Sequence, residues 1–232
     1  MRPVNKGESP YQTITDYKKA LPYLEKRIGS YCSYCEMPIF HVPEVEHMVS
    51  KSKGGDVTAW SNLLLGCKYC NSRKSTETTP LNVEEYLWPD TDNTALVFSY
   101  EEGVPQIDGE KLLKVDPTGT AYRKADNLFS LVKLNQTPDK NEKDKRWLRR
   151  NEAWQTAKDS LESWKNIKSA PAEYRNVYKW QMLQTAIYGG FFSVWMSVFA
   201  DESEILLELI ENFPGTQKRF FDENGKVKEI LE

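Results

Sequence analysis

Residues 32–74 of this 232-residue chain read CSYCEMPIFHVPEVEHMVSKSKGGDVTAWSNLLLGCKYCNSRK, and this stretch decides the fold. It begins and nearly ends with a Cys-x-x-Cys pair, Cys32/Cys35 and Cys67/Cys70. Each pair presents two sulfurs on one side of a short turn, and four thiolates complete a tetrahedral Zn²⁺ site with no open position for chemistry. The spacing therefore predicts a structural zinc ion that joins the two ends of the enclosed segment.

Composition sets broad limits on the class of protein. The length and the 39% hydrophobic content suit one or two globular domains with an ordinary core. All four cysteines belong to the two pairs, and no signal peptide opens the chain, so we expect a reducing, cytoplasmic location. The balance of 31 basic and 34 acidic residues argues against binding nucleic acid through bulk charge, so any phosphate contact must be local.

One uncharged stretch, Trp180–Ala200, is long enough in principle to span a membrane. Its glutamines, serines and the pair Gly189-Gly190 dilute the hydropathy, and no basic cluster flanks it. We therefore expect a helix buried against its own domain or a partner.

Hydrophobic periodicity and turn residues predict an α+β protein whose C-terminal half is mainly helical. We divide the chain into an N-terminal arm with a short helix (1–30), a zinc-bracketed core (31–80), a connector with a hairpin (81–117) and a helical domain (118–232). We expect a first helix near 17–28, which Thr15 or Asp16 caps and Pro22 breaks or kinks. The expected strands are 40–49, 63–65 and 95–100. Further helices are expected from about residue 70 and at 121–132, 147–164, 172–200 and 201–213.

The residues inside the zinc bracket suggest phosphodiester chemistry, which needs a base for water and a cation for the developing charge. His47 is our candidate general base, because imidazole titrates near neutrality. Glu46 and Asn71 offer the oxygen ligands that Mg²⁺ or Mn²⁺ prefers. Glu44 lies on the same strand face as Glu46 and could share or replace its role.

Other polar residues nearby have supporting roles in this hypothesis. Asn62 would be structural, with an amide that bridges a loop to the strand and so orients His47. The candidate phosphate contacts are four basic residues, Lys51, Lys53, Arg73 and Lys74.

At these positions the chain resembles the HNH endonucleases, in the branch whose ββα-metal core carries a four-cysteine zinc site. The resemblance rests on both cysteine pairs, on Glu46-His47, on Gly54-Gly55-Asp56, and on the runs 60–65 and 67–74. It implies that His47 is the first histidine of the motif, that Asn62 is its asparagine and that Asn71 replaces the final histidine. Two positions depart from the common pattern, since Glu46 stands where Asp or His is usual and Ser50 where proline often follows.

A second resemblance extends to the helical half. Segments 150–154, 190–196 and 213–216 are similar to those of HNH proteins in bacterial antiphage defence, notably the nuclease subunit of Septu-type systems and their retron-linked relatives. This similarity implies an ABC-like or SMC-like ATPase partner and a nuclease that stays inactive until infection. The helical domain would then be the docking platform.

Simpler interpretations accompany these hypotheses. The zinc fold could serve a nucleic-acid or protein-binding adaptor without catalysis. We expect His41 to be a non-catalytic surface or strand residue, because Pro43 interrupts its path. The basic run 140–150 is expected to be a solvated helix start. For Trp180 and Trp195 we expect core packing.

Overall fold

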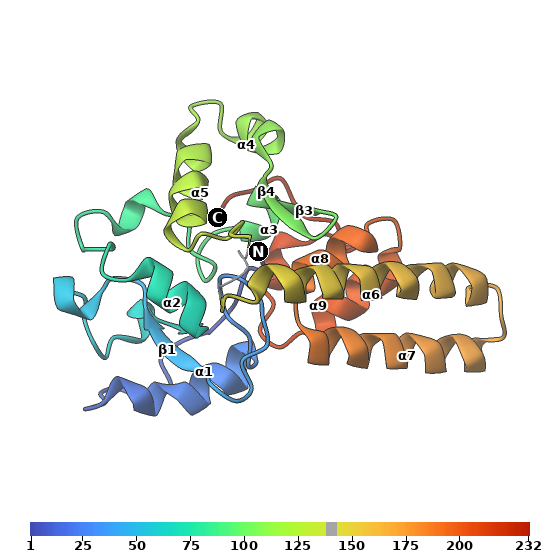
Figure 1. Ribbon diagram of the computed structural model, residues 1–232, viewed down its shortest axis with the longest axis horizontal. Helices are drawn as coiled ribbons and strands as arrows, with labels where there is room; N and C mark the ends of the chain where they lie inside the picture. The colour runs from blue at the N-terminus through green and yellow to red at the C-terminus, as the bar shows by residue number, and fades with distance from the viewer. Residues whose placement is uncertain (138–142) are drawn as a thin grey trace.

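A two-stranded antiparallel sheet and one helix form the centre of the zinc-bracketed segment in the computed structural model, which describes residues 1–137 and 143–232 (Figure 1). Strand β1 (Glu44–His47) pairs with β2 (Leu63–Gly66), and helix α2 (Lys68–Lys74) follows directly. This is the expected ββα order. Strand β1 is shorter than the predicted 40–49, because residues 39–42 form a turn in which Val42 N donates to Ile39 O at 3.2 Å.

The N-terminal segment packs beside this unit. A 3-10 turn, η1 (Tyr17–Ala20), leads into α1 (Leu21–Ile28). Asp16 caps the turn through a 2.9 Å hydrogen bond from Lys18 N. The expected helix 17–28 changes from a 3-10 turn to an α-helix at Leu21, beside Pro22, which agrees with the predicted break or kink. Pro22 itself lies in the first turn of α1, where its missing N–H would have no partner anyway.

The connector forms the expected hairpin, with one local difference. Strands β3 (Phe98–Glu101) and β4 (Val104–Ile107) are antiparallel, but residues 95–97 of the predicted strand 95–100 belong to the short helix α3 (Thr94–Val97). Asn93 explains this start, because its side chain accepts a hydrogen bond from Leu96 N. Helices α4 (Gly109–Val115) and α5 (Thr120–Leu131) then pack near the hairpin.

The C-terminal half is helical. Helices α6 (Arg146–Ile167) and α7 (Ala172–Gly189) lie side by side and project from the rest of the molecule (Figure 1). Helices α8 (Phe192–Val198) and α9 (Ser203–Asn212) pack at their base. Of the basic run 140–150, residues 140–142 lie outside the described residues, and α6 begins only at Arg146.

The predicted continuous helix 172–200 is wrong, because the chain turns at Gly190. The φ angle of Gly190 is +72°, and a Cβ there would lie 2.7 Å from Glu36 O and from Pro38 Cδ. The backbone thus passes so close to the zinc-bracketed segment that only glycine fits. The described part of the chain contains no helix that is both long and apolar enough to cross a membrane.

Two apolar clusters make up the core. One lies under the zinc-bracketed unit, the β3–β4 hairpin and α5, and the other joins α6, α7, α8 and α9. The prediction for Trp195 is confirmed, since it is 1% exposed in the second cluster. The prediction for Trp180 is wrong, because 62% of its surface is exposed on the outer side of α7.

One buried carboxylate connects these parts. Glu36, 3% exposed, follows the first cysteine pair directly. Its Oε1 accepts from Arg2 N at 2.9 Å, and its Oε2 accepts from Ser193 N at 2.7 Å. The hydroxyl of Tyr100, on β3, lies 3.5 Å from the same carboxylate. Glu36 therefore joins the zinc-bracketed unit to the N-terminal arm, to the hairpin and to α8.

Replacing Glu36 tests this junction. We expect Glu36→Gln to lower the free energy of unfolding by about 2 kcal/mol, because hydrogen bonds to an ionised acceptor are stronger than those to a neutral amide. Urea denaturation of the zinc-loaded protein measures the change. The matched variant Glu84→Gln, at an exposed acid, should leave the midpoint where it is. Equal midpoints for both variants would contradict the role of Glu36.

Candidate functional site

The four cysteines converge as the sequence predicts. Their Sγ atoms all lie within 4.8 Å of one another, each residue is at most 1% exposed, and all four thiols are free of disulfides. Buried thiol sulfurs at this spacing fit a tetrahedral zinc site. Cys67 has a second task, because its sulfur caps α2 by accepting a hydrogen bond from Cys70 N at 3.4 Å.

A buried arginine links this site to the helical half. Arg146, at the start of α6, donates to Cys70 Sγ at 3.1 Å and to Val132 O at 2.8 Å, and it pairs with Asp144 at 2.8 Å. Burial opposes its charge, but the Cys70 sulfur and Asp144 outweigh this effect and raise the pKa of Arg146. A cation here partly balances the negative charge that four thiolates would carry around one Zn²⁺.

Glu46 is buried beside a lysine. Lys74 Nζ lies 3.0 Å from Glu46 Oε1 and donates to His47 O at 2.7 Å. Burial raises the pKa of Glu46 to about 7, although the Lys74 charge opposes this shift. Lys74 is only 1% exposed. Its placement differs from the expected phosphate contact, because its ammonium faces the interior and holds the end of β1.

Asn71 lies beside the two acids of β1, Glu44 and Glu46. Its Nδ2 donates to Glu44 Oε2 at 2.7 Å, which leaves the amide oxygen of Asn71 as its remaining acceptor. Gly66 lies beneath, and a Cβ there would be 3.1 Å from Glu46 Cβ and 3.9 Å from Asn71 Cβ. The missing side chain of Gly66 thus allows Glu46 and Asn71 to approach each other. Their carboxylate and amide oxygens are a donor set that a hard divalent cation accepts.

The ring of His47 is held in one orientation. Its Nε2 lies 3.0 Å from Val57 O, and since a carbonyl only accepts, Nε2 carries the proton and Nδ1 carries the lone pair. The ring of Tyr17 meets it edge-on, with centroids 4.7 Å apart. Burial lowers the pKa of His47, the Val57 carbonyl opposes this, and Lys51 and Lys74 lower it further. The imidazole is therefore neutral at neutral pH and has a proton-accepting nitrogen.

Asn62 braces the loop that holds His47. Its side chain accepts from Val49 N at 2.7 Å and donates to Val49 O at 3.0 Å and to Asp56 O at 2.8 Å. Asp56 directly precedes Val57, whose carbonyl orients the His47 ring. Gly55 makes this loop possible, because a Cβ there would lie 2.2 Å from Val49 O.

The remaining basic residues differ in placement. Lys51 and Lys53 are exposed in the 3-10 turn η2 (Lys51–Lys53), and Lys51 Nζ lies 5.0 Å from the ring centre of Tyr17. Arg73 is half-buried on α2. Sequence reasoning missed Tyr17 and Arg146, because each is distant along the chain from the residues it contacts and belongs to no motif.

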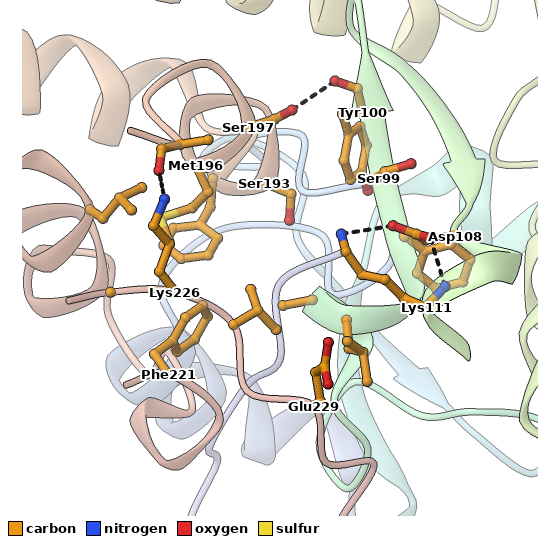
Figure 2. Close-up of a pocket in the computed structure, with 18 residues that line it drawn as sticks. Ser99, Tyr100, Asp108, Lys111, Ser193, Met196, Ser197, Phe221, Lys226 and Glu229 are labelled. Atoms are coloured by element: carbon orange, nitrogen blue, oxygen red, sulfur yellow. Dashed lines mark hydrogen bonds and ion pairs between the residues drawn. The ribbon is translucent and has the colours of Figure 1, made fainter. Parts of the chain in front are cut away.

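A different cavity, of about 340 Å³, lies between β3, α4 and α8 (Figure 2). Figure 2 shows Ser197 donating to Tyr100 O at 2.9 Å and Asp108 paired with Lys111 at 2.8 Å. Neither histidine of the chain lines it. None of the candidate catalytic side chains lines this cavity either.

Comparison with known families agrees with this geometry. Residues 32–77 match the family model described as HNH endonuclease. The matched segment contains the four cysteines and the residues Glu46, His47, Asn62 and Asn71. Neither the curated proteins nor the solved structures contain a match to this chain. The chain thus contains an HNH endonuclease domain with a cysteine cluster that fits zinc.

Replacement of one zinc ligand should damage the local fold. We expect Cys67→Ser to reduce bound zinc from about one ion per chain to a small fraction, because it removes one of the four thiolates, whereas the serine hydroxyl still caps α2. Elemental analysis of purified protein measures the zinc content. Ser33→Ala, inside the first knuckle but without a ligand atom, is the control and should keep its zinc. Full zinc occupancy in Cys67→Ser would refute the predicted four-thiolate site.

Proposed function

We propose that this chain is a metal-dependent endonuclease that hydrolyses phosphodiester bonds of nucleic acid. The observation that carries this proposal is the match of residues 32–77 to the HNH endonuclease family, in a segment where the Asn71 amide is hydrogen-bonded to Glu44, two residues before Glu46, and His47 ends the same strand. A binding module would need the zinc fold but not an oriented neutral imidazole at the end of the strand that carries the two acids.

His47 is the proposed general base. Its Nδ1 would accept the proton of the attacking water, while the Nε2 hydrogen bond to Val57 O keeps the ring in that tautomer. Asn62 acts as a positioning residue, because it holds the loop that ends at Val57. This division of roles agrees with the burial of both side chains, which restricts their rotation.

Glu46 and Asn71 are the proposed ligands of a catalytic Mg²⁺ or Mn²⁺. Such a cation would stabilise the charge that builds up on the phosphate and the leaving oxygen. Glu44 fits a positioning role better than that of a ligand, because it accepts a hydrogen bond from the Asn71 amide and so directs the amide oxygen. Lys51, Lys53 and Arg73 would contact substrate phosphates as point charges near the site.

The proposed base can be tested directly. We expect His47→Gly to cleave oligonucleotides in Mg²⁺ or Mn²⁺ roughly 10²–10⁴-fold more slowly, the usual contribution of a general base. Added imidazole should restore part of the rate, since it can occupy the vacated space and accept the proton. Gel assays of labelled DNA and RNA measure the rates, and zinc content and circular dichroism show that the fold is intact. Cleavage at the rate of the unchanged protein would refute the nuclease mechanism and favour the adaptor interpretation.

We further propose that the helical half docks on an ABC-like or SMC-like ATPase of an antiphage defence system. The support is the resemblance of segments 150–154, 190–196 and 213–216 to HNH proteins of Septu-type and retron-linked systems. The exposed side of α7 adds a physical reason. It carries four large side chains that are more than half exposed, namely Tyr174, Val177, Trp180 and Tyr188. Aromatic residues in such positions are enriched at protein interfaces.

Co-expression of the chain with its native gene neighbours tests this partnership, because the proposal requires one of them to encode an ABC-like or SMC-like ATPase. We expect Trp180→Ala to reduce the amount of co-purified ATPase at least several-fold without changing the melting temperature, because an exposed interface anchor contributes to binding and not to the core. Tyr122→Ala, at an exposed aromatic residue on α5, is the matched control and should retain the ATPase. Elution of the unchanged protein as a lone monomer after co-expression would contradict the complex.

A further inference from the structure

One aromatic side chain of the N-terminal segment reaches the proposed base. Tyr17 is the first residue of η1 and lies outside the segment 32–77 that matches the HNH endonuclease family. The centre of its ring is 4.7 Å from that of His47, and the two ring planes make an angle of 69°. Edge-to-face aromatic pairs have centroids roughly 4.5–7 Å apart, so this contact is a close one.

The ring of Tyr17 is itself held in place. Asp16 caps η1 by accepting a hydrogen bond from Lys18 N at 2.9 Å, and the Tyr17 ring packs against the first apolar cluster. Lys51 Nζ lies 5.0 Å from the centre of this ring and donates to its hydroxyl at 3.4 Å. Tyr17 is therefore a fixed neighbour for His47.

The hydrogen bond to Val57 does not fix the imidazole by itself. His47 Nε2 lies 3.0 Å from Val57 O, but the ring can still turn about this contact, because the second side-chain torsion of histidine has broad minima. Such a turn would move Nδ1, the nitrogen that accepts the proton in the proposed mechanism. A displacement of about 1 Å in a reacting group can slow a reaction roughly 10²-fold. The Tyr17 ring supplies a second restraint against it.

Packing in the core explains Tyr17 less well. Residues that only fill the first apolar cluster, such as Leu24 and Leu63, are fully buried, whereas Tyr17 is half-buried. Its hydroxyl accepts from an exposed lysine, Lys51. His47, which the Tyr17 ring meets, is only 7% exposed. The contact that distinguishes Tyr17 is thus the one with the candidate base.

We propose that Tyr17 is a positioning residue of the nuclease site, whose ring keeps the His47 imidazole with Nε2 on Val57 O and Nδ1 available to accept a proton. The site is then incomplete without η1, although the family match begins at residue 32. This inference rests on the proposed function for the role of His47. The orientation of the ring, however, can be measured without any cleavage.

Nuclear magnetic resonance of the imidazole N–H measures this orientation. The chain has two histidines and His41 is exposed, so a ring N–H that exchanges slowly with water should belong to His47 and be absent from His47→Ala. We expect Tyr17→Ala, in the zinc-loaded protein, to speed this exchange roughly 3- to 10-fold, because the hydrogen bond to Val57 O opens more often. Tyr17→Phe keeps the ring and should keep the slow exchange.

Cleavage kinetics measure the consequence for the reaction. With an oligonucleotide that the unchanged protein cleaves in Mg²⁺ or Mn²⁺, we expect Tyr17→Ala to lower kcat roughly 10-fold and to change KM less than about twofold, because Tyr17 places the base and does not bind substrate. Tyr17→Phe should retain kcat. The matched control is Tyr23→Ala, which removes an exposed ring from α1 and should alter neither kcat nor the exchange rate. Melting temperatures show that the variants are folded.

The outcomes separate this inference from the proposed function. If Tyr17→Ala keeps the slow exchange or the kcat of the unchanged protein, or if Tyr23→Ala is equally damaging, Tyr17 does not position the base. Fast exchange of the His47 N–H in the unchanged protein would contradict a held ring in the same way. If exchange responds as expected but the unchanged protein cleaves nothing, Tyr17 still orients His47 and the nuclease proposal fails.

Discussion

Four sulfur atoms within 4.8 Å of one another are the constraint on which the rest of this structure depends. They hold the chain before β1 close to the start of α2. The short two-stranded sheet, which would be only marginally stable alone, is thereby fixed against this helix. The contacts outward from this cluster are polar and buried. Glu36 reaches the N-terminal arm and α8, and Arg146 reaches Cys70 from α6. Ionic and hydrogen-bonded contacts therefore join the two halves in addition to apolar packing.

The same constraint explains how a short strand and a short helix hold several polar side chains next to one another. Residues 44 and 46 alternate onto one face of β1, and Asn71 and Lys74 lie one turn apart on α2 opposite them. Each acid thus meets one partner, Glu44 the Asn71 amide and Glu46 the Lys74 ammonium. Gly66 has no side chain and so leaves room for the side chains of Glu46 and Asn71. The Lys74 ammonium offsets the charge of Glu46, so a divalent cation bound to that carboxylate would compete with Lys74.

His47 points to the other side of β1 and owes its orientation to the loop between the strands. The Asn62 amide joins both ends of that loop, and the carbonyl of Val57 receives the ring N–H. A tautomer and an orientation are therefore specified by hydrogen bonds from the residues around the loop. This loop and α2 therefore support His47 and Asn71 separately.

Local sequence predicted a large part of this arrangement, because much of it depends on local rules. The cysteine spacing predicted the cluster of four sulfurs, Asp16 was one of two caps expected for the first helix, and a hairpin was expected in the connector 81–117. The candidate polar residues inside the bracket were also evident, since a zinc knuckle alone does not require them.

Tertiary contacts decided what these local rules leave open. Lys74 reads as a surface cation but is buried, because Glu46 and the His47 carbonyl provide partners from another strand. Trp180 reads as core but is exposed, because the α6–α7 pair projects beyond the second cluster. The long uncharged run reads as one helix but turns at Gly190, where the backbone of residues 36–38 passes too close for a side chain. Sequence alone thus determined most of the elements and the residue types of the candidate site, whereas burial, pairing and direction were set by segments far apart in the chain. Free energies of desolvation and packing depend on neighbours that no local pattern specifies.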